Sequence, residues 1–192
     1  MTRHNSQVVV GYDFSGSGQE ALSRAIALAR RAPSHVLHFV CAIEPQGSIP
    51  AVPLTGKVDY LYAERVRDGL AKVVGEELAA ASSSEAIHFF VHARIGKPAD
   101  QILALAREVG AELIIVGTKG LTGVEHIILG SVAEKVVREA GCTVEVARPT
   151  TYSRVQLLEI KEVESSHHHV KPHRYSYVAT QVQLRPTEWP LY

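Results

Sequence analysis

Short apolar runs alternate with longer segments of helical periodicity along most of the chain. The runs predict five strands, at residues 8–10, 36–43, 87–91, 113–116 and 142–147. Between them, apolar residues recur every three or four positions, as in amphipathic helices, at about residues 18–31, 58–81, 98–109 and 131–140. Strands that are apolar throughout and are joined by helices predict a parallel sheet with helices on both faces.

The loops that follow the first and fourth strands are the expected place for chemistry, because ligands of such sheets bind beyond the carboxyl ends of the strands. A further loop, at residues 44–57, contains three prolines and two glycines. Prolines and glycines at this density interrupt helices and strands. This loop is long enough to form a lid.

Beyond residue 148 the helical periodicity stops. Apolar and polar residues alternate from Val178 to Leu184, as in one half-buried strand, and residues 157–160 are a candidate partner strand. We therefore expect a core domain over residues 1–148 and a C-terminal extension over residues 149–192, either two-stranded or partly disordered.

Length and charge narrow the class of protein. The 192 residues fit one domain on the usual scale of roughly 100–200 residues. Twenty basic and twenty acidic side chains give a formal net charge of zero. This balance argues against a sequence-independent nucleic-acid binder, which needs excess positive charge to displace counterions from phosphates.

Membrane and redox signals point to the cytoplasm. No apolar run approaches the roughly 20 residues that cross a bilayer, and the polar N-terminus lacks the apolar core of a signal peptide. We expect a cytoplasmic protein with no membrane partner. Cys41 and Cys142 lie in apolar segments without CxxC spacing, which predicts buried thiols rather than a disulfide or a zinc site.

The most informative segment follows the fourth strand. It reads GTKG at residues 117–120 and, nine residues later, Gly130-Ser131 at the start of a helix. Glycines let a ligand approach the backbone, and a helix start offers unpaired amide hydrogens and the positive end of the dipole. Together they can cradle a polyphosphate, with charge from Lys119 and a hydroxyl donor from Ser131. Alternatively, the glycines only shape the loop and Ser131 caps the helix.

The spacing of this loop resembles that of one protein family. Gly117, Gly120, Gly130 and Ser131 fit G-x2-G-x9-G-[ST], and the first strand ends in a polar stretch that contains Asp13. Over about residues 7–148 the sequence resembles the universal stress protein family, in its ATP-binding branch. The resemblance implies a flavodoxin-like α/β fold with a doubly wound parallel five-stranded sheet in the order 3-2-1-4-5, a homodimer and adenine-nucleotide binding.

The resemblance also implies roles for individual residues. Asp13 would face the ribose hydroxyls, the backbone at Phe39 would face adenine, and the glycine loop would surround the phosphates. Tyr12 departs from the family pattern, in which a smaller residue is common at this position. The candidate binding residues are Tyr12, Asp13, Ser15, Phe39, Val116, Gly117, Lys119, Gly120, Gly130, Ser131 and Val132.

Other motifs match less well. Residues 16–21 fit the dinucleotide pattern G-x-G-x-x-[GA], but three residues separate them from the strand, so a plain helix start is preferred. The chain has no G-x-x-x-x-G-K-[ST] phosphate loop. Histidines at 167–169 and 173 could hold a transition metal, but Pro172 interrupts their spacing and they lack a suitably placed carboxylate or cysteine. We expect no metal site.

These observations favour an ATP-binding stress-response or signalling module that works through changes in loop order or dimer contacts, with ATP bound with or without Mg²⁺. No general base accompanies the glycine loop, so we expect a binding protein rather than an enzyme, with slow hydrolysis left open. The alternative is a dimeric scaffold of the same fold that binds partner proteins and no nucleotide. A metal-responsive module built on the histidine-rich extension is a third hypothesis. In either of the first two, we expect Val144 and Val146 at the homodimer contact.

Overall fold

The computed structural model describes residues 5–80, 86–118 and 129–149, together with the backbone of four short strands further along the chain. The chain divides into two compact units, Met1–Pro149 and Thr150–Tyr192. Among the described helices, none combines the length and the apolar composition that crossing a membrane requires.

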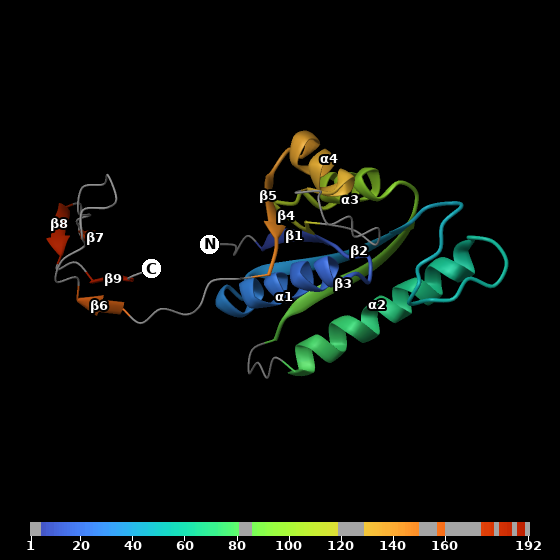
Figure 1. Cartoon of the computed structure of the whole chain (residues 1–192), viewed down its shortest axis with the longest axis horizontal. Helices are drawn as coiled ribbons and strands as arrows, with labels where there is room; N and C mark the ends of the chain where they lie inside the picture. Colours follow the sequence, from blue (N-terminus) through green and yellow to red (C-terminus); the bar gives the residue numbers. More distant parts are fainter. Residues whose placement is uncertain are drawn as a thin grey trace, which may run out of the picture. The chain divides into compact units, whose positions relative to one another are not determined.

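The first unit is built on one parallel sheet (Figure 1). Its strands are β1 (Ser6–Gly11), β2 (His35–Ile43), β3 (His88–Ile95), β4 (Leu113–Gly117) and β5 (Thr143–Ala147). Its helices are α1 (Gly16–Arg31), α2 (Tyr60–Ala80), α3 (Pro98–Val109) and α4 (Ser131–Glu139). Every neighbouring pair of strands is parallel, and the order across the sheet is β3-β2-β1-β4-β5. The predicted flavodoxin-like, doubly wound sheet is therefore confirmed.

Two apolar cores, one on each face of the sheet, explain why the strands are apolar throughout. Val8 and Val10 of β1 pack with α1 and α2, whereas Val9 between them packs with α3 and α4. Successive strand residues point to opposite faces, so one strand serves both cores. Figure 1 shows the same layers, with α1 and α2 on one side of the sheet and α3 and α4 on the other.

Several element boundaries differ from the predicted ones by one to four residues, and two of these differences have a visible cause. β3 extends to Ile95 instead of ending at residue 91, because its polar second half still pairs with β2. α1 begins at Gly16 rather than near residue 18, since the Ser15 hydroxyl accepts a hydrogen bond from the Gly18 amide and caps the helix. Strand pairing and capping set these ends, and neither leaves a mark in the hydrophobic periodicity.

The two cysteines differ in burial. Cys41 in β2 is fully buried, as predicted, and burial raises the pKa of its thiol to about 12. Cys142 lies just before β5 and is only half-buried, so the prediction of a buried thiol is wrong for this residue. Both cysteines are free thiols, as expected.

The second unit contains two antiparallel strand pairs. β7 (Arg174–Val178) pairs with β8 (Gln181–Arg185), and β6 (Leu157–Glu159) pairs with β9 (Glu188–Pro190). The predicted single strand from Val178 to Leu184 with residues 157–160 as its partner is wrong, because the alternation continues from one strand of a hairpin into the next. Period-two alternation does not reveal a short connection between two strands. The histidines at 167–169 and 173 lie outside the described residues.

Candidate functional site

A cavity of about 300 Å³ lies at the carboxyl ends of β1, β2 and β4. This is the place where the strand order reverses, and parallel sheets of this kind bind their ligands there. The loops after β1 and β4 both contribute walls, as predicted, and the loop after β2 adds a third. The lining residues are Gly11, Tyr12, Asp13, Gly18, Val40, Ala42, Ile43, Glu44, Gly47, Ser48, Ile49, Pro98, Ile102, Val116, Gly117, Thr118, Gly130, Ser131, Val132 and Ala133.

Most of the predicted binding residues meet at this cavity. Those that line it are Tyr12, Asp13, Val116, Gly117, Gly130, Ser131 and Val132. Ser15 and Phe39 are described but are not among the lining residues. Lys119 and Gly120 lie outside the described residues. The two halves of the glycine motif, which are distant in sequence, therefore reach the same cavity.

Phe39 lies in the core between the sheet and the helices α1 and α2. Its side chain is 0% exposed and packs edge-on against Phe89, with ring centroids 6.2 Å apart. The next residue, Val40, points to the other face and lines the cavity. The carbonyl oxygen of Val40 accepts a hydrogen bond of 2.9 Å from the Tyr12 amide, which ties the ends of β1 and β2 together.

Asp13 has both a structural contact and a place in the cavity wall. Its Oδ1 accepts hydrogen bonds from the Ser15 amide at 3.0 Å and from the Ser15 hydroxyl at 2.5 Å. The same hydroxyl caps α1, so Ser15 links the carboxylate to the helix start. Both described bonds end on Oδ1, which leaves Oδ2 able to accept a hydrogen bond from a ligand.

The turn after β1 holds an unusual backbone conformation. Phe14 has a φ of 61°, and among the described residues it is the one non-glycine position with a positive φ. Its ring packs edge-on against Tyr12, with centroids 5.1 Å apart. Residues other than glycine rarely adopt this left-handed backbone conformation, so the surrounding packing must hold Phe14 in place.

The start of α4 presents backbone amides to the cavity. Gly130 is the N-cap residue, in an extended conformation, and no described side chain caps the helix. The Gly130 amide donates a 2.7 Å hydrogen bond to the Thr118 carbonyl, which joins the two halves of the glycine motif. Ser131 is the first helical residue, so the alternative in which it caps the helix is wrong. The first-turn amides have no partner within their own helix, as at any helix start, and such amides can donate to an anion.

A second helix starts at the same cavity. Pro98, at the first position of α3 as predicted, lines the wall together with Ile102. The N-cap residue Lys97 makes no side-chain capping bond either. The positive ends of two helix dipoles therefore converge on the cavity.

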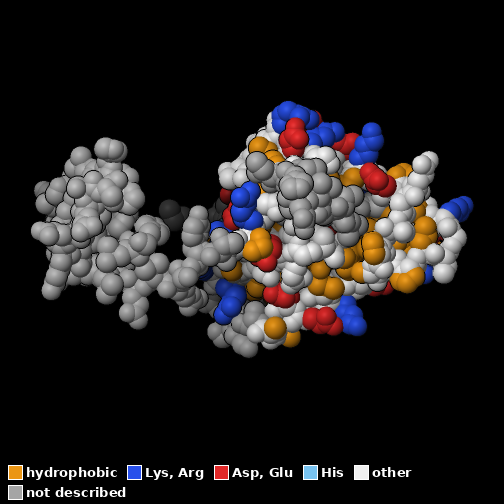
Figure 2. Space-filling view, in the orientation of Figure 1, with side chains coloured by type: hydrophobic (Ala, Val, Ile, Leu, Met, Phe, Trp, Pro, Cys, Tyr) orange, Lys and Arg blue, Asp and Glu red, His pale blue; other side chains and the backbone are white. Residues whose placement is uncertain are grey.

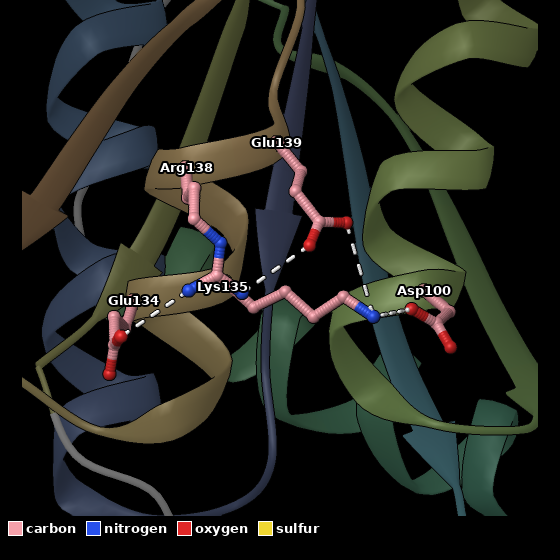
Figure 3. A network of polar contacts seen from close by, with 5 residues as sticks. All are labelled: Asp100, Glu134, Lys135, Arg138 and Glu139. Carbon is pink, nitrogen blue, oxygen red and sulfur yellow. Dashed lines mark hydrogen bonds and ion pairs between the residues drawn. The ribbon is translucent and has the colours of Figure 1, made fainter.

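An ion pair connects α3 to α4. Figure 3 shows Lys135 of α4 between Asp100 of α3 and Glu139 of its own helix. The hydrogen bond between Lys135 and Asp100 raises the pKa of Lys135 and lowers that of Asp100. In Figure 2, acidic and basic side chains lie together over these helices, so their charges neutralise one another on this surface. The Lys135–Asp100 pair thus adds a surface contact between two helices that already share one apolar core.

Charge in the cavity wall is acidic. Among the described lining residues, Asp13 and Glu44 are the charged ones. An anion bound here would therefore depend on backbone amides, hydroxyl groups and helix dipoles rather than on a described basic side chain.

Gly117 is a glycine for a packing reason. A Cβ at this position would lie 2.3 Å from the carbonyl oxygen of Ser17 at the start of α1. This distance is impossible for a real side chain, so the close approach of α1 to β4 already requires glycine. The glycine at this motif position is explained without any ligand.

Sequence reasoning missed several lining residues. Thr118, between two motif positions, is 8% exposed and lines the cavity. Gly47, Ser48 and Ile49 come from the loop after β2, which is long enough to form a lid but supplied no candidate residue. The density of prolines and glycines indicated the loop, but nothing in its sequence showed which residues turn inward.

Fold and cavity together define a flavodoxin-like α/β protein with a cavity at the reversal of strand order. A model of the universal stress protein family matches residues 4–148. A universal stress protein of Methanocaldococcus jannaschii is 32% identical over 145 residues, which cover 74% of this chain and 81% of that protein. Universal stress protein YxiE of Bacillus subtilis is 30% identical over 154 residues, covering 74% and 99%. This chain belongs to the universal stress protein family.

Solved structures agree with this assignment. A universal stress protein in complex with cAMP is 26% identical, with a TM-score of 0.53 and coverage of 75% of this chain and 97% of that one. A universal stress protein from Archaeoglobus fulgidus in complex with dAMP shares the fold at 22% identity and a TM-score of 0.52, covering 76% and 99%.

Proposed function

We propose that the cavity between β1 and β4 binds an adenine nucleotide, with ATP as the physiological ligand. The observation that carries the proposal is the start of α4, a helix N-terminus that opens into a cavity of about 300 Å³ and that no side chain of the described residues caps. Its amides would donate to phosphate oxygens, and its dipole would favour their negative charge. The family match supports this proposal, as does the 26% identical relative in complex with cAMP.

The other walls suit the rest of such a ligand. Val40 and Ile49 offer apolar surface for a planar base, and the second carboxylate oxygen of Asp13 would accept a hydrogen bond from a ribose hydroxyl. Thr118 and Ser131 add hydroxyl groups near the start of α4. The negative charge of Asp13 and of Glu44 favours a nucleotide whose phosphates are partly neutralised by Mg²⁺.

The protein acts in this proposal as a nucleotide-dependent module rather than as an enzyme. Asp13 is hydrogen-bonded by Ser15, which suits a carboxylate that orients a ligand more than one that removes a proton from water. The useful event is then binding, which would order the loops around the cavity and change the surface offered to a partner protein.

Assembly as a homodimer belongs to the same proposal. β5 lies at one edge of the sheet, and its Val144 and Val146 are only half-buried against α4. An open edge strand with apolar side chains favours pairing with a second copy. Glu145, between the two valines, is paired with Arg24 of α1 and so leaves the opposite face of the strand apolar.

Native mass spectrometry of the purified full chain, followed by calorimetric titration with ATP, cAMP and GTP, tests the ligand. We expect a bound adenine nucleotide, or saturable binding of ATP that exceeds the binding of GTP. Absence of binding to any of the three would favour the nucleotide-independent scaffold instead.

A further inference from the structure

Tyr62 of α2 ties the loop after β2 to the helix that follows it. Its side chain is 0% exposed. The hydroxyl oxygen accepts a 2.8 Å hydrogen bond from the Ile49 amide, and the hydroxyl donates a 2.8 Å hydrogen bond to the Val52 carbonyl. The Val52 amide donates to the Ile49 carbonyl at 2.9 Å, which closes the same segment into a tight turn. One side chain therefore satisfies both outward backbone groups of this turn.

The position of Tyr62 is itself fixed by the start of α2. The Asp59 carboxylate accepts a 2.9 Å hydrogen bond from the Tyr62 amide, and the Asp59 carbonyl accepts one of 3.0 Å from the Ala63 amide. Both bonds lie in the first turn of the helix, where amides otherwise have no partner. The backbone of Tyr62 is consequently fixed by the first turn of α2, independently of the loop that its side chain binds.

Gly69 supports the same turn from the same helix, two turns further on. A Cβ at Gly69 would lie 3.2 Å from Cγ2 of Val52 and 3.8 Å from Cζ of Phe14. Residues seven positions apart share one face of a helix. Val52 from the loop after β2 and Phe14 from the loop after β1 therefore meet over this glycine.

The supported turn forms part of the cavity wall. Ile49 lines the cavity and is 5% exposed, and Phe14 is adjacent in sequence to the lining residue Asp13. Any shift of the turn would move Ile49 relative to the other lining residues, such as Val40. Tyr62 and Gly69 do not line the cavity themselves. They contact the turn at residues 49–52, and through it they can set the position of the lining residue Ile49.

We infer that Tyr62 and Gly69 are positioning residues that set the affinity of the cavity for its nucleotide by holding residues 49–52 in place. This inference rests on the proposed nucleotide function. Tyr62 acts by holding the turn against α2 through its two hydrogen bonds. Gly69, which has no side chain, leaves space for the side chain of Val52 to pack against the helix.

Two substitutions test this with different expected effects on stability. Tyr62→Phe keeps the ring, removes both hydrogen bonds and lowers the melting temperature. Gly69→Ala improves helix propensity and so keeps or raises the melting temperature, while its methyl group pushes on Val52. Both variants weaken ATP binding in calorimetry, Tyr62→Phe about tenfold and Gly69→Ala about threefold. Val74→Ala, fully buried on α2 but outside this contact, is the destabilised control and keeps wild-type affinity.

Hydrogen exchange in the ligand-free protein separates this inference from the nucleotide proposal. The Ile49 amide donates directly to the Tyr62 hydroxyl, so its exchange becomes faster in Tyr62→Phe and stays unchanged in Val74→Ala. Unchanged exchange at Ile49, or faster exchange with unaltered ATP affinity in both test variants, would overturn the inference. Failure of the wild-type chain to bind any adenine nucleotide would overturn the proposed function, and the exchange rate would still decide whether Tyr62 holds the turn.

Discussion

At the scale of single residues, the glycines that flank the loop between β4 and α4 play different physical roles. Gly117 has no room for a side chain because α1 approaches it closely, whereas Gly130 begins a helix in an extended conformation that other residues can adopt. One motif therefore combines a packing position with a position at the cavity, and substitutions at the two should separate folding from binding.

Substituting Gly117 should affect folding first. The methyl group of Gly117→Ala would meet the Ser17 carbonyl at 2.3 Å, so either α1 or β4 must move. We expect a loss of about 2 kcal/mol or more in the free energy of unfolding, as for other overpacked sites. Thermal and urea unfolding measure it. Gly16→Ala is the matched control, since a Cβ there meets nothing within 4 Å, and equal losses for both variants would contradict the packing argument.

Substituting Gly130 should affect ligand binding first. Gly130 has φ −70° and ψ 155°, values that a β-branched residue adopts without strain. Gly130→Val costs only about 1 kcal/mol as a poorer N-cap. Its branched side chain would obstruct the approach of phosphate to the amides of α4, and we expect at least a tenfold loss of ATP affinity with an unchanged circular dichroism spectrum. Unaltered affinity would refute the phosphate site.

At the scale of elements, a chain of polar side chains crosses three neighbouring strands. His38 of β2 contacts His92 of β3 through Nδ1 and Nε2 at 3.1 Å, and its own Nε2 contacts Oε1 of Gln7 in β1 at 2.8 Å. An amide oxygen can only accept, so His38 donates to Gln7 and its Nδ1 accepts from His92. Phe90 stacks on His38, with ring centroids 5.0 Å apart. The chain joins β1, β2 and β3 with neutral imidazoles.

This pair makes stability depend on pH. Burial lowers the pKa of His38, and burial together with the neighbouring His38 and Arg94 lowers that of His92 to about 4. Because the unfolded histidines titrate near pH 6.5, the unfolded chain binds more protons below that pH. The stabilisation is therefore complete above about pH 6.5 and is lost as the pH falls toward 4.

We accordingly expect the melting temperature to fall between pH 7.5 and pH 5.5, before most carboxylates titrate. His92→Phe removes one titrating group from the pair and should flatten this part of the profile. A scan of thermal unfolding against pH, with the exposed His88→Phe as control, measures both. An equally steep profile in His92→Phe would show that other groups cause the dependence.

At the scale of the whole molecule, the open question is which surface a second copy covers. The first unit leaves β5 at the edge of its sheet, and a further 43 residues follow it in the second unit, Thr150–Tyr192. Light scattering on the full chain and on a chain that ends at Thr150 decides between two arrangements. We expect a homodimer in both cases. A monomeric full chain that becomes dimeric on truncation would mean that the second unit occupies the edge of β5.

The sequence by itself determined the order of elements, the parallel sheet and the place of the cavity. Apolar runs and helical stripes are local signals, and they predicted a parallel sheet covered by helices on both faces. The family resemblance carried by the glycine spacing implied the doubly wound strand order and seven of the lining residues. Other features depend on which parts of the chain meet in space. These are the length of β3, the choice of Val40 over Phe39 at the cavity and the pairing of Arg24 with Glu145.

Only the tertiary structure explained the role of residues whose contacts lie in distant parts of the sequence. Gly117 is constrained by α1, and Tyr62 holds a turn ten or more residues before it through bonds to backbone groups. Any residue offers such groups, so no side-chain pattern announces them. In the second unit, the same alternation of apolar and polar residues fits one long strand or a hairpin, and only the observed pairing of β7 with β8 decides between them.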